Sequence, residues 1–70
     1  MFCFVILKRT FDRSTGFIMS IDMVKAFQAL KDASKYALMQ NYFADSSTVF
    51  SVEPMTLSVE TFEAVNLYED

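Results

Sequence analysis

The sequence predicts a small α+β domain in which an antiparallel sheet packs on one main helix. Three observations favour this class: an apolar, β-branched and aromatic opening segment, a turn with Asp and Gly between two apolar runs, and a long stretch of helix-forming residues without Gly or Pro. The expected order is strand, strand, helix, strand (ββαβ), with a short helix or a tail at the C-terminus. No repeat or linker divides the chain, so we expect a single domain over residues 1–70.

The first strand is expected over residues 2–7, FCFVIL. Its apolar side chains do not alternate with polar ones, so both faces of the strand require cover. Even-numbered residues would point to one face and odd-numbered residues to the other. One helix covers one face of a small sheet, and the second face is therefore expected to need another protein surface, either an identical chain or a target.

A hairpin turn is expected at residues 12–16, DRSTG, where Asp and Ser bond the local backbone and Gly16 supplies a positive φ. The second strand is expected to run to about Met23, because the first strand needs a partner. The same residues also match a helical repeat, so the boundary between strand and helix is expected anywhere between Ser20 and Phe27.

A helix is expected from about Val24 to Phe43, where Ala, Leu, Lys, Gln and Met dominate. One stripe of this helix would face the sheet, and it consists of Leu30, Ala33, Ala37 and Leu38. Its alanines make the buried side thin, so the helix can lie close to the sheet. The last turns carry a second apolar side.

A third strand is expected over residues 48–52. Pro54 marks an edge, a bulge or a break, because proline cannot donate to a ladder of main-chain hydrogen bonds. The nearest apolar residues before Pro54 are even-numbered and those after it are odd-numbered, so the two groups would point to opposite faces of a continuous strand. Ser58 would cap a short helix near residues 59–66, although the alternation there also fits a strand or a tail.

Charge is divided unevenly along the chain. Residues 1–40 hold six basic and three acidic side chains, which gives +3, and residues 41–70 hold six acidic and no basic ones, which gives −6. Such a division can steer one copy against another, or attract a basic partner. The alternative is that the acids only keep an exposed C-terminal segment soluble.

The opening apolar run, residues 1–7, is far shorter than the ~20 residues that cross a bilayer. It has no preceding basic segment and no small-residue cleavage site, so it does not resemble a secretory signal. Cys3 lies within this run and is expected to be a buried, reduced thiol. These features predict a cytoplasmic protein without a membrane partner.

Much catalytic chemistry is excluded by composition. The chain has no His, one Cys and one Gly, which leaves no Ser-His or Cys-His pair, no structural zinc site and no glycine-rich phosphate loop. Glu60 and Glu63 would share a helix face, but they lie in an acidic, solvated segment. We expect no enzyme, no cofactor and no metal. A nucleic-acid partner is not expected either, because the chain is acidic and only three cations lie near Phe11.

With 53% hydrophobic and 16% aromatic residues, the chain is rich in apolar side chains for a body of ~4,400 Å² surface. Since Met, Tyr and Phe are favoured where proteins meet, we expect a non-catalytic, self-associating interaction module, a homodimer or higher oligomer that also binds another protein. The candidate interface residues are Phe2, Phe4, Ile6, Phe11, Phe17, Tyr36, Tyr42 and Phe43.

The alternative function is an oligomeric sponge that sequesters a small nucleotide at a subunit interface. An aromatic ring would stack on the base, and cations would contact the phosphates. The candidate cations are Lys8, Arg9, Arg13 and Lys25.

The succession of FVILKRTFDRSTG, a second strand, a helix and VFSVEPMTL resembles short phage-encoded accessory proteins with strand–strand–helix–strand architecture. The resemblance covers residues 2–57. It implies a small viral protein that works by binding in the host cytosol, where such proteins block a host defence factor or enzyme or sequester a signalling molecule. No site residue is transferred from it.

Overall fold

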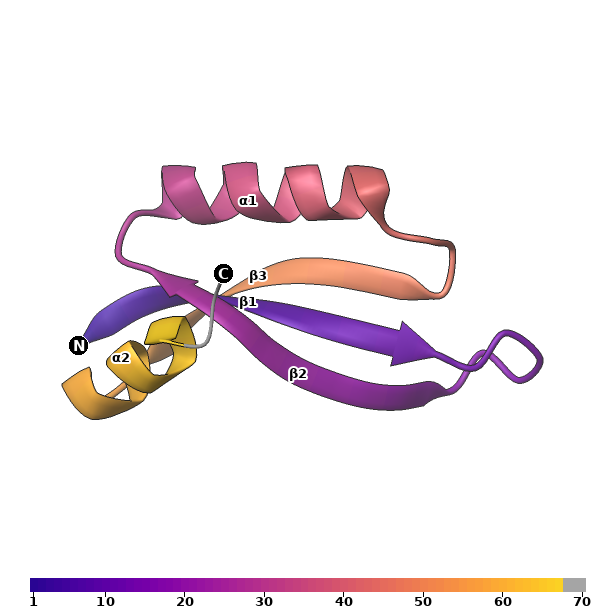
Figure 1. The fold of residues 1–70 in the computed structure, drawn as a ribbon, viewed down its shortest axis with the longest axis horizontal. Coiled ribbons are helices and arrows are strands. Elements are labelled where there is room, and N and C mark those ends of the chain that lie inside the picture. The colour runs from indigo at the N-terminus through magenta and orange to yellow at the C-terminus, as the bar shows by residue number, and fades with distance from the viewer. Residues whose placement is uncertain (68–70) are drawn as a thin grey trace.

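The computed structural model describes residues 1–67. Its elements are β1 (Phe2–Phe11), β2 (Ile18–Phe27), α1 (Leu30–Phe43), β3 (Thr48–Thr56) and α2 (Val59–Leu67). The strands form one antiparallel sheet in the order β2-β1-β3. Figure 1 shows α1 above this sheet and α2 beneath the end where β1 begins, with the β1–β2 hairpin at the other end. The α+β class and the sheet are as expected, but two helices cover the sheet rather than one.

Both hairpin strands are longer than expected, and the boundary between strand and helix falls at the late end of its expected range. Residues 24–27, expected to begin the helix, belong to β2, where Ala26 pairs with Val5 and Phe27 with Phe4. In this position Ala26 is buried and only 3% exposed. Tertiary pairing and burial thus outweigh the weak helical preference of this segment.

A β-bulge at Val24 changes which side chains of β2 face α1. Ile6 pairs with Lys25 and Leu7 with Met23, so Val24 has no partner of its own in the ladder. Val24 packs in the cluster beneath α1, and the extra residue shifts the alternation by one. Lys25 therefore shares the face of Ile6, toward α1, whereas Met23 shares the face of Leu7, toward α2.

The turn between β1 and β2 has the expected chemistry. The Asp12 carboxylate accepts the N–H groups of Ser14 (2.7 Å) and Thr15 (3.2 Å), and Gly16 has a φ of 76°. The main-chain N–H of Asp12 donates to the carbonyl of Phe17 at 2.8 Å, which closes the loop.

The face of the sheet under α1 holds the first core cluster, in which Ile6, Ala33 and Ala37 are buried. The expected helix stripe is half right. Leu30 and Leu38 are exposed. Leu30 is the first residue of the helix, and the residues of the helix that pack against the sheet are Ala33 and Ala37. Leu38 follows Ala37 by one residue, about 100° around the helix, and so turns toward solvent.

The opposite face holds the second core cluster, where Cys3 and Val5 are 0% exposed and pack with Phe62 and Val65 of α2. The expectation that this face of residues 2–7 needs another chain is therefore wrong. The short helix after Ser58 forms instead and covers it, capped by the Ser58 hydroxyl, which accepts the N–H of Thr61 at 3.1 Å.

Two asparagine carboxamides close the outer edges of the sheet. Asn41 of α1 accepts the N–H of Phe50 and donates to its carbonyl, both at 2.8 Å, and Asn66 of α2 does the same for Ala26 at 3.2 and 3.1 Å. Phe50 thus turns its main-chain groups outward, and Pro54, an even number of residues away, shares that direction. The missing N–H of proline removes no bond to β1, so β3 runs on through Pro54 to Thr56.

Candidate functional site

An apolar surface remains open on the α2 side of the sheet, at the end near the hairpin. Cross-strand partners share a face, and the pairs of Arg9 with Ile21 and Val49 and of Phe11 with Ile18 therefore continue the face of Cys3 and Val5. We call this surface the open sheet patch; it consists of Phe11, Ile18, Ile21, Met23 and Val49. Ile18 is 51% and Ile21 54% exposed, values far above those of the covered half.

The open sheet patch exists because α2 is short. β1 has 10 residues and α2 has 9, so the strand spans about 33 Å and the helix about 14 Å. The helix lies against the half of the face that contains Cys3 and Val5. The other half carries no element of the chain among residues 1–67 (Figure 1).

Arg9 of β1 is a charged residue within the open sheet patch, since it lies between Ile21 of β2 and Val49 of β3. Its guanidinium donates a hydrogen bond to the hydroxyl of Ser51 on β3. Because Ser51 pairs with Leu7, this bond tilts the side chain toward the covered half and away from Phe11.

A second apolar surface lies on the solvent side of α1. We call it the helix strip; it consists of Lys35, Leu38, Met39, Tyr42 and Phe43, which line an open hollow of about 430 Å³. Tyr42 and Phe43 are 82% and 78% exposed, and their rings meet edge to face at 5.1 Å. Large exposed aromatic rings grouped in this way are typical of surfaces that bind other proteins.

The expected interface residues fall into separate groups. Ile6 is buried beneath α1 and cannot contact a partner, which corrects its place among them, and Phe4 and Tyr36 are half-buried in the same region. The other expected residues are accessible: Phe11 belongs to the open sheet patch, Tyr42 and Phe43 to the helix strip, Phe17 to the hairpin end, and Phe2 to the opposite end.

Sequence reasoning missed most of the open sheet patch, namely Ile18, Ile21, Met23 and Val49. A signal was present, because every second residue from Phe17 to Met23 is apolar, while the other phase carries the polar Ser20 and Asp22. Two register shifts in β2, at Val24 and at Met19, then decide which side chains face away from α1, and the sequence pattern does not mark them.

The four expected phosphate-binding cations do not form one cluster. Lys8 lies on the α1 side and lines an open hollow of about 210 Å³, and Lys25 sits with its Nζ 5.6 Å from the ring centre of Phe27. Arg9 lies on the opposite face, and Arg13 stands in the hairpin loop. A single chain therefore offers no site in which all four contact one ligand.

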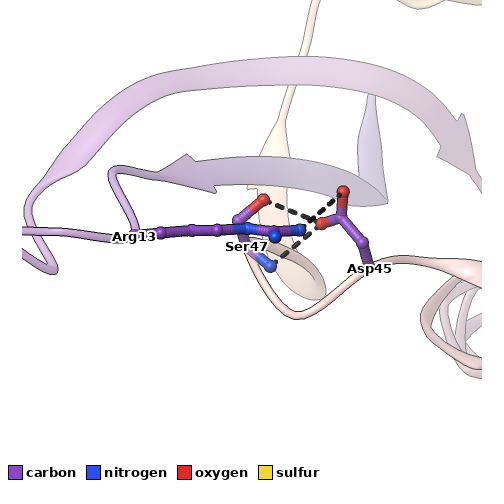
Figure 2. Close-up of polar contacts among 3 residues, drawn as sticks. All are labelled: Arg13, Asp45 and Ser47. Atoms are coloured by element: carbon purple, nitrogen blue, oxygen red, sulfur yellow. Dashed lines mark hydrogen bonds and ion pairs between the residues drawn. The ribbon is translucent and has the colours of Figure 1, made fainter.

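Arg13 joins the hairpin to the loop before β3. Figure 2 shows Arg13 and Ser47 both reaching the Asp45 carboxylate. The Arg13 guanidinium lies 3.6 Å from it, and the hydroxyl and N–H of Ser47 donate to it at 2.8 and 2.9 Å. The Ser47 bonds and, to a smaller degree, the Arg13 charge lower the pKa of Asp45. Both side chains are largely exposed, so the ion pair contributes little stability.

Metal and membrane features were sought in residues 1–67. Within this range no three His, Cys, Asp or Glu side chains gather closely enough to hold a metal ion. None of the helices described there combines the length and apolar character that crossing a membrane demands. Glu60 and Glu63 lie exposed on α2, whereas Glu69 and Asp70, the last acids of the C-terminal segment, are outside the described residues.

Comparison with known proteins gave no relationship: no family model, curated protein or solved structure matches this chain.

Proposed function

We propose that this chain is a non-catalytic interaction module that self-associates and presents the helix strip to a different protein. The observation that carries the proposal is the open sheet patch. A sheet face that is closed over one half and apolar and exposed over the other is incomplete as a monomer surface.

The chain exposes 4953 Å², against the ~4,400 Å² that its mass gives by size scaling. The open sheet patch and the helix strip leave large apolar side chains such as Ile21 and Tyr42 exposed to water. Association removes such area from water and is favourable by about 25 cal/mol per Å² before its entropic cost.

The two surfaces lie on opposite sides of the molecule, since α1 covers one face of the sheet and the open sheet patch belongs to the other. An assembly formed through one surface therefore leaves the second accessible. The role implied by the resemblance, inhibition of a host factor by binding, would use the helix strip, where Lys35 is a cation that favours an acidic neighbour.

Self-association is tested by light scattering over about 5 to 500 µM, a range that brackets dissociation constants of weak dimers. We expect a mass above the 8.0 kDa of one chain at the upper concentrations. A mass of 8.0 kDa at every concentration would remove self-association from the proposal.

Binding of a different protein is tested with Leu38→Lys, which changes the helix strip at a side chain that is 74% exposed. Partner proteins captured by the wild-type chain should not be captured by this variant, while the mass of the variant itself stays that of the wild type. Equal capture of partners by the wild type and the variant would show that the helix strip has no such role.

A further inference from the structure

We propose that the free edge of β2, from Ile21 to Met23, binds an extended segment of another protein as a fourth strand. The segment places a basic side chain opposite Asp22 and an apolar side chain on either side of it. The site consists of main-chain groups along the edge of the sheet, whereas the self-association proposed above concerns the sheet face. The inference therefore goes beyond that proposal and does not depend on it.

The main-chain groups of two β2 residues, Ile21 and Met23, point away from the sheet. Both pair with odd-numbered residues of β1, which is the one neighbour of β2 in the sheet. Alternate residues of a central antiparallel strand bond to opposite neighbours, and the N–H of Phe11, which donates to Ser47 at 2.8 Å, shows that the odd-numbered residues of β1 bond on the β3 side. No group within residues 1–67 bonds to the outward N–H and C=O of Ile21 and Met23.

The other outward positions of the sheet are largely closed. The two asparagine carboxamides hold Ala26 of β2 and Phe50 of β3, and Pro54 of β3 has no N–H to offer. No two successive outward residues of β3 therefore keep all their main-chain groups free. Proteins normally block exposed edges in these ways, because open edges invite pairing. On β2 the two successive outward residues Ile21 and Met23 are left open, which is the spacing that an incoming strand requires.

Side chains at this edge define the chemistry of the partner. Ile21 and Met23 lie on the α2 side and are 54% and 36% exposed, whereas the exposed Asp22 lies between them on the α1 side. In an added strand, the residues paired with Ile21 and Met23 also turn to the α2 side, next to apolar side chains. The residue between them faces Asp22 at about 5 Å, where an opposite charge stabilises the pair and a like charge destabilises it.

The charge of Asp22 is available to such a partner. Lys8 faces it from β1, but Asp22 forms no ion pair within residues 1–67. The order that complements this edge is therefore apolar, basic, apolar, in a segment of extended main chain.

Asp22 also argues against a second copy at this edge. A two-fold antiparallel pairing of β2 with β2 that uses both open residues sets Ile21 of each copy against Met23 of the other. Asp22 then lies directly opposite its own equivalent, and like charges in that position are destabilising. The neighbouring registers run into Met19 or Val24, the residues without a ladder partner, and keep only one regular bonded pair.

The test uses capped peptides of the sequence Ser-Thr-Val-Lys-Val-Thr-Ser, which reads the same in both directions, and the same peptide with Glu in place of Lys. NMR titration follows the main-chain amides of Ile21 and Met23 up to about 5 mM peptide, because single short strands bind weakly. We expect a dissociation constant of about 0.1–1 mM for the lysine peptide, about threefold or more below that of the glutamate peptide. Absence of binding by both peptides overturns the inference, and equal binding overturns the partner chemistry assigned to Asp22.

A third peptide tests whether the main chain makes the contact. N-methylation of both valines removes the N–H groups that would bond to Ile21 and Met23 and leaves the charge unchanged. Its dissociation constant should be about tenfold or more higher than that of the parent peptide. Equal binding would show that the peptide does not add to the sheet as a strand.

Variants of the chain itself complete the test. Asp22→Lys should reverse the preference, so that the glutamate peptide binds more tightly, and an unchanged preference would overturn the role of this charge. Ile21→Pro removes an outward N–H and no bond to β1, as Pro54 does in β3, and should weaken both peptides. Leu38→Lys on the helix strip is the matched control and should bind as the wild type does.

Circular dichroism checks that each variant is folded. If Ile21→Pro does not fold, Asp22→Lys and the N-methylated peptide still decide the question. A wild type that is monomeric and binds the lysine peptide would remove self-association and leave this inference standing.

Discussion

Asn41 and Asn66 show how single side chains protect a small sheet. A primary carboxamide carries one acceptor and two donors, and thus can take the place of a neighbouring strand at one residue. Each asparagine bonds both outward main-chain groups of one edge residue, Phe50 for Asn41 and Ala26 for Asn66. Exposed edge groups otherwise invite pairing with other chains, so these contacts both stabilise the fold and restrict association.

We predict that Asn66→Ala lowers the free energy of unfolding by about 1–3 kcal/mol, because the part-buried N–H and carbonyl of Ala26 lose their partners. Asn66→Asp should cost a similar amount, since a carboxylate cannot donate to the carbonyl. Urea denaturation measures both, with the exposed Glu63→Ala on the same helix as the matched control. A change no larger than that of the control would contradict the role of this side chain.

Asp45 gives a prediction on pH. The Ser47 hydroxyl, the Ser47 N–H and the Arg13 charge lower the pKa of its carboxyl in the folded chain from the ordinary 3.8. Its contribution to stability is therefore fully present above about pH 3.8 and is lost as the pH falls through the lower folded value. NMR titration should place Asp45 below 3.8 and Ser47→Ala should raise it; titration at 3.8 in the wild type would contradict the contact.

The dispersed cations predict how the chain responds to nucleotides. Lys8 and Arg9 leave β1 on opposite faces, and Arg13 is engaged with Asp45. Without a shared site, mononucleotides and dinucleotides should leave the melting temperature unchanged at millimolar concentration. An increase of several degrees, lost in Arg13→Gln, would instead support the nucleotide sponge.

At the scale of elements, α2 is the part of the fold that decides which apolar surface remains open. It forms because Ser58 caps it and because Phe62 and Val65 find Cys3 and Val5 beneath them. Because α2 covers one face of β1 and α1 the other, the apolar start of β1 lies in the core. The apolar surface that stays exposed is the half of the sheet near the hairpin.

We predict that Phe62→Ala lowers the free energy of unfolding by about 2–3 kcal/mol, less than the ~3–5 kcal/mol of a fully buried phenylalanine because this ring is only half-buried. It should also raise the rate at which a thiol reagent modifies Cys3, which is now 0% exposed, because α2 opens more often. Glu63→Ala, next to it and exposed, is the control. Unchanged Cys3 reactivity with lowered stability would show that α2 does not control access to this core.

At the scale of the whole molecule, the chain is elongated. Its extents are 39 × 22 × 20 Å, and its radius of gyration is 12.6 Å, against about 11 Å for a compact domain of this length. The long axis follows from strands of 10 residues beneath a helix of 14. Such a shape leaves a large surface for a small mass.

We predict that the melting temperature rises with protein concentration, because dissociation of a dimer precedes or accompanies unfolding and is opposed by mass action. A hundredfold increase in concentration should raise it by several degrees in the wild type and leave that of Ile21→Lys constant. Differential scanning fluorimetry at several concentrations measures both. Curves that superimpose for the wild type would argue for a monomer.

The sequence was informative wherever local chemistry decides the structure. Asp12 and Gly16 form the expected turn, Ser58 caps the expected short helix, and the central segment is helical between Leu30 and Phe43. It was misleading where long-range pairing decides. Residues 24–27 became strand because β1 offered them partners. Ile6, expected at an interface, is buried beneath Ala33 and Ala37 of α1.

The amino-acid sequence alone therefore determined the class of the fold, the turn and the existence of more apolar surface than a chain of 70 residues conceals. Where that surface lies was decided by the tertiary structure. The reason is physical: composition sums over residues, whereas exposure depends on which element packs over which half of a sheet. Here the length of α2 and two extra residues in β2, Val24 and Met19, made that choice.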